Sequence, residues 1–136
     1  MAEDKERKEI RMNIFVLFCL IIAGGCQTLP PEKKNEAWYQ KKWCAGHGGR
    51  IEVIMPDKTR CDCVTFRYAV EVEFARKWAE AITQTLHYAR LTGKRPGIVF
   101  ICRRQSDLIN IARAVDNIKF YKLGIKIWRI GCEKES

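Results

Sequence analysis

Residues 68–74 carry the clearest pattern of apolar and polar positions in the chain. Val70 and Val72 alternate with Glu71 and Glu73, which is the two-residue period of a strand with one buried face. Because every second side chain points the same way, the two carboxylates project from one face, about 7 Å apart along the strand. The pattern therefore predicts a half-buried strand that presents two acids side by side.

A second short strand, residues 60–65, is predicted just before it. If the two strands form a hairpin around Phe66 and Arg67, Asp62 lies directly across from Glu71, and cross-strand partners share a face. Phe-Arg is not one of the Gly or Asn pairs that favour two-residue hairpin turns. A slip of one residue in the pairing would turn Asp62 away from the other acids.

An amphipathic helix is predicted for residues 75–91. Its buried stripe follows the helical spacing of apolar positions: Trp78, Ile82, Leu86 and Ala89. A neighbouring stripe is polar, with Lys77, Gln84 and Tyr88 within roughly 20° of one another at 3.6 residues per turn. These three side chains follow the edge of the core face, where they reach over the predicted sheet.

The remaining elements follow from the same kind of pattern. A helix over 36–43, a strand over 51–55, a fully buried strand over 98–102 and a final strand over 125–130 are predicted. Ser106 is the expected N-cap of a helix that ends near residue 119, with an inward stripe of Leu108, Ile111, Ala112 and Val115. The resulting order, αβββαβαβ, predicts an α/β fold with a mixed central sheet and flanking helices.

The acids and the polar helix positions carry a family resemblance. An acid on one strand, an acid-x-acid pair on the next and Gln-x-x-x-Tyr on the following helix resemble the PD-(D/E)XK nuclease superfamily, in particular its exonuclease-like branch. The resemblance covers about 27 residues. It implies a restriction-endonuclease-like αβββαβ core, and a pair of acids that bind a divalent metal which activates water.

Residue by residue, the resemblance implies that Asp62 and Glu71 bind the metal. Glu73 stands where the family has lysine, and Lys77, one turn into the helix, is the nearest substitute for positioning the attacking water. An equally valid alignment makes Glu73 the acid of the motif and hence a metal ligand. Both alignments expect Mg²⁺ or Mn²⁺ as the cofactor.

Other residues join this predicted site with supporting roles. By the same resemblance, Gln84 and Tyr88 support the site from the helix, and Glu36, on the helix before the sheet, is a candidate extra metal ligand. Asp57 is expected to cap the turn at 56–59, and it is the alternative first acid if the hairpin register differs. His47 is left out of the site, because a single loop histidine seldom binds a metal. The competing interpretation treats the strand acids as solvated and the helix residues as a hydrogen-bonding rim.

The N-terminal region has a different character from the rest of the chain. Residues 14–25 form an apolar run of signal-peptide length, followed by Cys26. The sequence around Cys26 resembles the lipobox of bacterial lipoproteins, which implies a signal peptide over 1–25, lipid attachment at Cys26 and a tether over 26–35. A buried helix or an uncleaved anchor is the alternative. The resemblance implies a protein anchored in the bacterial cell envelope and facing the periplasm.

The net positive charge of the chain lies outside its first 25 residues, mainly in the predicted domain, residues 36–136. The chain has 136 residues and a net charge of +9, while the first 25 residues contain equal numbers of acidic and basic side chains. The whole positive excess therefore lies in the part that folds, and such a surface suits a polyanion or an anionic membrane. The expected phosphate contacts are Arg76, Arg90, Lys94, Arg95, Arg103 and Arg104.

Five cysteines follow Cys26, and outside the cytoplasm thiols of that number tend to pair. Cys44 is expected to pair with Cys61 or Cys63, which would join the first helix to the hairpin. Cys61-x-Cys63 is not the spacing of a zinc site.

Taken together, the two resemblances and the positive charge predict a membrane-tethered, metal-dependent nuclease acting on DNA. The alternatives are a catalytically inactive nuclease-fold lipoprotein that binds nucleic acid, anionic lipid or a protein, and a disulfide-stabilised structural lipoprotein.

Overall fold

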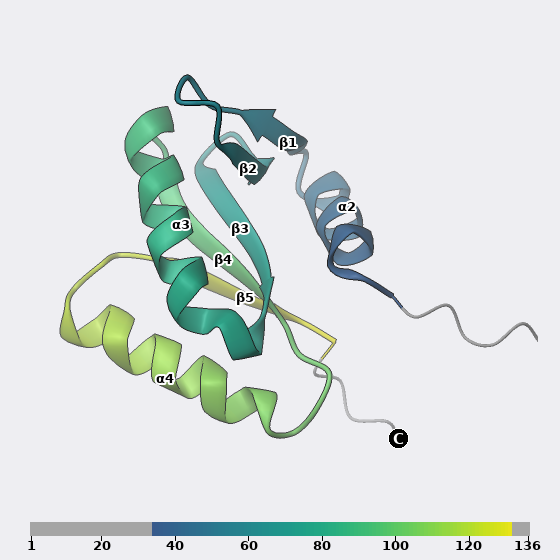
Figure 1. The fold of residues 1–136 in the computed structure, drawn as a ribbon, viewed down its shortest axis with the longest axis vertical. Coiled ribbons are helices and arrows are strands. Elements are labelled where there is room, and N and C mark those ends of the chain that lie inside the picture. The colour runs from purple at the N-terminus through teal and green to yellow at the C-terminus, as the bar shows by residue number, and fades with distance from the viewer. Residues whose placement is uncertain (1–33, 132–136) are drawn as a thin grey trace, which may run out of the picture. The chain divides into compact units, whose positions relative to one another are not determined.

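The computed structural model describes residues 34–131 (Figure 1). The predicted signal peptide and lipid-attachment Cys26 lie outside the described residues. Within these residues, no helix has the length and apolar character needed to cross a membrane. The elements are α2 (Glu36–Gly46), β1 (Arg50–Ile54), β2 (Arg60–Val64), β3 (Tyr68–Phe74), the 3-10 helix η1 (Ala75–Lys77), α3 (Trp78–Thr92), β4 (Arg95–Ile101), α4 (Asp107–Phe120) and β5 (Lys126–Ile130).

The five strands form one mixed sheet in the order β1-β2-β3-β4-β5. Strands β1, β2 and β3 are antiparallel neighbours joined by short turns, whereas β3, β4 and β5 are parallel. Parallel neighbours need long connections, and α3 and α4 supply them. The predicted α/β class and the predicted order αβββαβαβ are confirmed.

Strand β4 separates the two main apolar clusters. Ile98 and Phe100 pack on the side covered by α3 and α4, and Val99 and Ile101 pack on the side of α2. All four side chains are fully buried, as a continuous apolar run predicts for a strand covered on both faces. Figure 1 shows α3 and α4 on one face of the sheet and α2 apart from them.

The phase of α3 differs from the prediction. Its buried positions are Ala81, Thr85 and Tyr88, while the predicted stripe of Trp78, Ile82 and Leu86 is only partly buried against the core. The first turn is a 3-10 turn, which has three residues per turn and rotates the following helix. Small side chains at positions 81 and 85 allow the helix to approach the backbone of the sheet.

The predictions for β4 and α4 also need correction. Strand β4 begins at Arg95, because residues 95–97 already pair with the start of β3. Ser106 is the N-cap residue, as predicted, although its side chain makes no capping bond within the described residues; the Asp107 carboxylate accepts hydrogen bonds from the backbone N–H groups of Arg103 and Arg104, which precede the helix. Ala112 is exposed, and the inward stripe is formed by Ile111, Ala114 and Ile118.

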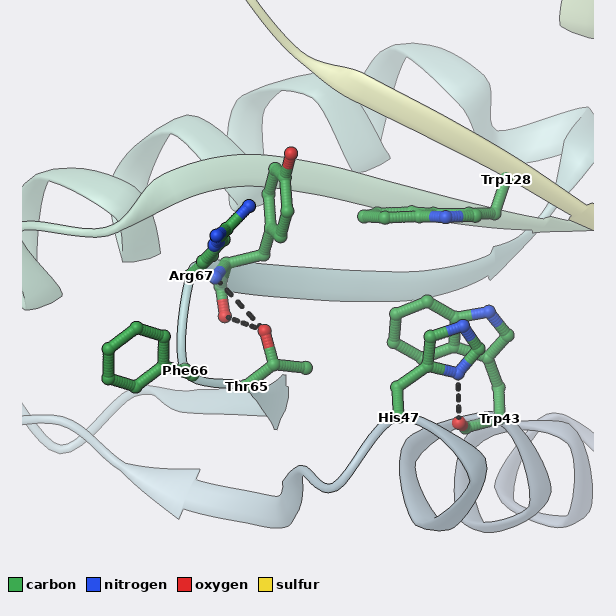
Figure 2. A pocket seen from close by; sticks show the side chains of 7 residues that line it. Trp43, His47, Thr65, Phe66, Arg67 and Trp128 are labelled. Atoms are coloured by element: carbon green, nitrogen blue, oxygen red, sulfur yellow. Dashed lines mark hydrogen bonds between the residues drawn. The ribbon is translucent and has the colours of Figure 1, made fainter.

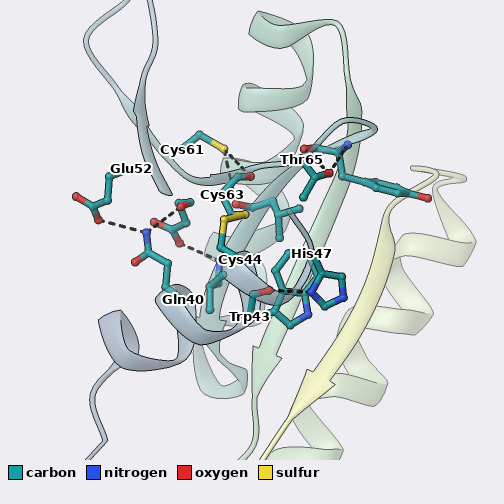
Figure 3. The surroundings of a disulfide bond; sticks show 12 residues. Gln40, Trp43, Cys44, His47, Glu52, Cys61, Cys63 and Thr65 are labelled. Atoms are coloured by element: carbon teal, nitrogen blue, oxygen red, sulfur yellow. Dashed lines mark hydrogen bonds between the residues drawn. A yellow bond between two sulfur atoms is a disulfide. The ribbon is translucent and has the colours of Figure 1, made fainter. Parts of the chain in front are cut away.

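A disulfide between Cys44 and Cys63 joins α2 to β2 (Figure 3). Of the two predicted pairings, the structure contains this one, and Cys61 is a buried free thiol. A Cβ atom on Gly49 would lie 2.5 Å from the Cys63 sulfur and 2.6 Å from the Cys44 sulfur. Glycine at position 49 therefore lets the chain pass close to the bridge as it enters β1.

Candidate metal site

Glu71 and Glu73 lie inside the protein and not on a solvated strand face. Their side chains are 6% and 4% exposed. Both project from β3 on the side opposite Val70 and Val72, which pack towards α2. The interpretation of these acids as solvated surface charges is therefore wrong, and each needs a physical reason to be buried.

Asp62 approaches β3 through the predicted hairpin register. The pairs Cys63↔Val70 and Val64↔Ala69 continue to Asp62 opposite Glu71, but the pairing of the two strands ends at Cys63. Beyond it, the Asp62 carboxylate accepts a hydrogen bond from the Val72 backbone N–H at 2.9 Å. Asp62 thus replaces a ladder bond with its side chain and brings its charge next to β3.

Glu73 is the centre of a small polar network. Its Oε1 accepts a hydrogen bond of 2.8 Å from the Phe74 backbone N–H, and its Oε2 accepts one of 3.1 Å from Lys77 Nζ. The hydrogen bond to Glu73 is the main reason that the pKa of Lys77 is raised. Lys77 therefore carries a positive charge next to Glu73. Its side chain is 43% exposed, so this charge lies at the solvent side of the acids.

Glu36, the first residue of α2, contributes another carboxyl to the same place. Burial raises its pKa to about 7, and a hydrogen bond with Glu73 and the charges of Glu73 and Asp62 act in the same direction. Two carboxyl groups can form such a bond only when one of them holds the proton. Helix α2 thus places its N-terminal acid against the end of β3.

The remaining acids have raised pKa values for the same physical reason. Burial raises the pKa of Asp62 to about 6, against the hydrogen bond from Val72. Burial and the charges of Asp62 and Glu73 raise the pKa of Glu71 to about 9. Oε2 of Glu71 is buried and has no hydrogen-bond partner among residues 34–131. A buried oxygen without a partner, next to other acids, suits a cation.

The donor set fits Mg²⁺ or Mn²⁺ in chemical type, because every candidate ligand is a carboxylate oxygen. Within residues 34–131, however, no three His, Cys, Asp or Glu side chains are placed so that they could hold one ion together. Asp62, Glu71, Glu73 and Glu36 are thus electrostatic neighbours that do not form a preassembled coordination shell.

The two residues of the Gln-x-x-x-Tyr pattern have different surroundings. Gln84 donates a long hydrogen bond of 3.4 Å to Glu80 on the same helix, at the surface. Tyr88 is buried with Met55 and Ala69. Burial, followed by the charges of Glu71 and Asp62, raises the pKa of Tyr88 to about 12. Tyr88 is therefore close to the acids electrostatically, whereas Gln84 contacts none of the predicted metal ligands among the described hydrogen bonds.

Gln40 is a structural partner that the sequence analysis missed. Its side-chain nitrogen donates to the Asp62 backbone carbonyl at 2.9 Å and to Glu52 at 3.2 Å (Figure 3). Gln40 follows Glu36 by one helical turn, so the two lie on the same side of α2. The sequence did contain a signal for this contact. Gln40 is a polar residue one helical turn after the candidate ligand Glu36, on a helix predicted to flank the sheet.

The predicted phosphate contacts divide into groups. Arg76, Arg103 and Arg104 line one hollow of about 280 Å³ beside Phe74, whose ring lies 5.1 Å from the Arg76 guanidinium carbon and 4.5 Å from that of Arg103. Phe74, which lines this hollow, is the residue directly after Glu73. The other three expected contacts, Arg90, Lys94 and Arg95, are not among the residues that line it.

Asp57 takes the role of a turn cap. It accepts hydrogen bonds from the backbone and the hydroxyl of Thr59, which confirms the predicted cap, and it pairs with His87 at 2.7 Å. The β2–β3 register is the one on which the choice of Asp62 over Asp57 depended.

Comparison with known proteins gives no independent assignment. No family model, no curated protein and no solved structure matches this chain. The functional assignment therefore depends on the residues and geometry described above.

Proposed function

We propose that the protein is a metal-dependent phosphodiesterase that cleaves DNA, with its site at the acid cluster of Asp62, Glu71, Glu73 and Glu36. The observation that carries the proposal is Glu71, a buried carboxyl with an oxygen that lacks a partner within the part of the chain that the structure describes, in a protein of net charge +9. Burying an acid among acids is costly, and a bound divalent cation would remove that cost. The resemblance to PD-(D/E)XK nucleases supports the same assignment.

Asp62 and Glu71 would hold the ion, and Glu73 and Glu36 stand beside them as further oxygen ligands. A bound Mg²⁺ or Mn²⁺ supplies a water of lowered pKa and neutralises charge on the phosphate. Lys77, on the exposed side of Glu73, would orient the attacking water. Arg76, Arg103 and Arg104, which line the adjacent hollow, would neutralise and hold the phosphates next to the scissile bond.

The proposal includes the place of the protein in the cell. Lipid attachment at Cys26 would anchor it in the bacterial cell envelope with the domain in the periplasm. The Cys44–Cys63 disulfide supports an oxidising compartment. Cys26→Ser is expected to move the protein from the membrane fraction to the soluble fraction, and retention of that variant in the membrane would contradict lipid anchoring.

The direct test measures plasmid cleavage with Mg²⁺, with Mn²⁺ and with EDTA. Asp62→Asn and Glu71→Gln are expected to abolish cleavage, because each removes a charged ligand while keeping the size of the side chain. Asp116→Asn, an exposed acid on α4, is the matched control and should cleave like the wild type. Cleavage that survives both substitutions would place the reaction elsewhere.

A second candidate function is a binding module that has the same fold without catalysis. Glu73 occupies the position of the family lysine, and the acids within residues 34–131 do not form a ready metal shell. This candidate predicts DNA binding that is indifferent to Mg²⁺ and no cleavage by any form of the protein. Titration calorimetry with Mg²⁺ and Mn²⁺ separates the two candidates without any measurement of activity.

A further inference from the structure

A second hollow, of about 250 Å³, lies between α2, β5 and the β2–β3 turn (Figure 2). Trp43, His47, Tyr68 and Trp128 are among the side chains that line it. Tyr68 projects from β3 on the same side as Val70 and Val72, so it points away from Glu71 and Glu73. The hollow is therefore separate from the acid cluster, and none of the proposed hydrolytic residues uses it.

The rings around the hollow are fixed before any ligand binds. Trp43 and His47 stack with their centroids 3.9 Å apart and their planes 15° apart, and His47 Nδ1 donates to the Trp43 carbonyl at 2.7 Å. Trp128 lies against Gly97, where a Cβ atom would come within 2.7 Å of the indole. Rings held in this way lose little freedom when a ligand binds against them.

The β2–β3 turn adds an aromatic ring and a cation at the rim. Phe66 is 90% exposed, and Arg67 is exposed beside it. Neither residue type favours a tight turn. The turn is held by other groups: Thr65 Oγ1 accepts from the Tyr68 backbone N–H, and Lys94 Nζ donates to the Phe66 carbonyl at 2.7 Å. Phe66 and Arg67 thus face solvent on a rigid support that does not require them.

The chemistry of the lining selects the ligand. Aromatic walls favour a flat ring system, and the volume is below the roughly 300–1,000 Å³ of typical small-molecule pockets, which suits a single ring system. Among the described residues that line this hollow none is a carboxylate, and the Arg67 guanidinium at its rim repels an organic cation. Arg67 favours an anionic group attached to the ring.

We propose that this aromatic hollow binds one unpaired nucleobase of a single-stranded nucleic acid, with Phe66 stacking on the neighbouring base and Arg67 binding the adjoining phosphate. The inference depends on the proposed function in one respect, that nucleic acid is the substrate. The base-binding hollow would be a second contact with single-stranded nucleic acid, separate from the acid cluster. Glu73 comes five residues after Tyr68 along β3, a path of about 16 Å.

The test measures the tryptophan fluorescence of the full chain in mild detergent with EDTA, so that no hydrolysis occurs. The probes are an oligothymidylate of about eight nucleotides and an abasic sugar-phosphate strand of the same length. The oligothymidylate is expected to quench the fluorescence and to bind about tenfold more tightly than the abasic strand, because only the former can stack.

Phe66→Ala and Arg67→Ala are each expected to weaken oligothymidylate binding about tenfold. Phe66→Ala should also erase most of the difference between the two probes. The matched controls are Phe120→Ala, another exposed phenylalanine at 79%, and Arg129→Ala, an exposed arginine of β5. Trp128→Phe keeps an aromatic wall and should weaken binding less than Phe66→Ala does.

Equal binding of the two probes, or an equal loss of affinity in Phe66→Ala and Phe120→Ala, would overturn the proposal. These outcomes are distinct from a failure of the proposed function. A protein that prefers the oligothymidylate through Phe66 but never cleaves plasmid would disprove hydrolysis alone. A protein that cleaves with Mg²⁺ and shows no preference for bases would disprove the base-binding hollow alone.

Discussion

Thr85 connects α3 to the sheet through a single hydroxyl group. Its Oγ1 accepts a hydrogen bond from the Gly97 backbone N–H at 2.9 Å and lies 2.8 Å from the Gly97 carbonyl and 3.2 Å from that of Ala69. The residue is fully buried, so no water can replace these bonds. The hydroxyl thus satisfies polar backbone groups of two neighbouring strands.

Thr85→Val should therefore lower the free energy of unfolding by about 1–3 kcal/mol, because it leaves buried backbone groups without a partner. Thr85→Ser keeps the hydroxyl and should lose less. Urea unfolding at unchanged m-value measures the difference. A valine variant as stable as the serine variant would show that the hydroxyl contributes nothing.

Glu71 makes the stability of the protein depend on pH. Its pKa is raised from 4.5 to about 9 in the folded state, so the folded protein binds more protons than the unfolded chain between these values. The stability associated with Glu71 is present in full below about pH 4.5 and is lost as the pH rises through about 9. Asp62 and Glu36 act in the same direction at lower pH, while Lys77 offsets part of the negative charge.

We expect the melting temperature of the wild type to fall by several degrees between pH 6 and pH 9, since about 1 kcal/mol corresponds to roughly 4–8 °C in a domain of this size. Glu71→Gln should flatten the profile and be more stable than the wild type at pH 9. Asp116→Asn serves as the control. A Glu71→Gln profile that parallels the wild type would mean that Glu71 is charged throughout.

At the scale of the elements, the disulfide ties the helix that carries Glu36 to the strand that carries Asp62. Cys44 and Cys63 are separated by 19 residues, and a cross-link of this loop length stabilises by about 3 kcal/mol in the chain-entropy model. The Cys44→Ala/Cys63→Ala variant is expected to lose about 2–4 kcal/mol in urea unfolding. A loss below about 1 kcal/mol would show that packing alone holds α2 in place.

Local patterns were sufficient to predict most of the elements. The alternation of β3 and the apolar run of β4 each reflect the burial of that strand, so the order of elements followed from the sequence. The phase of α3 could not be predicted, because the 3-10 turn over Ala75–Lys77 has no local signal in the pattern. The N-cap position of α4 at Ser106 was predicted correctly, whereas the hydrogen bonds of the Asp107 side chain to the preceding loop were not predicted.

The site was predictable only in part for a related reason. Strand alternation placed Glu71 and Glu73 together, and the hairpin register added Asp62. The contact between Glu36 and Glu73 joins residues far apart in the chain, and no periodicity encodes it. Nor could a pattern of charges show that these acids are buried, because an alternating strand has the same sequence whether its polar face meets water or a helix.

For the whole molecule, the positive charge should control binding to duplex DNA. In EDTA, log Kd should rise linearly with the logarithm of the salt concentration. The slope should be about 0.9 for each phosphate that the protein neutralises. Arg104→Ala, in the hollow beside Phe74, should reduce the slope by about 1. Arg113→Ala, an exposed arginine on α4, is the matched control. Equal slopes for both variants would show that the hollow does not contact the backbone of DNA.

The position of the free thiol has a consequence for how the chain must be produced. Cys61 and Cys63 are two residues apart in β2, and only Cys63 is joined to Cys44. In a newly made chain that oxidises before β2 packs against β3, Cys61 competes with its neighbour Cys63 for Cys44. Production in a host that supplies a disulfide isomerase should therefore raise the yield of correctly bridged protein, whereas rapid air oxidation of the unfolded chain should trap the Cys44–Cys61 isomer.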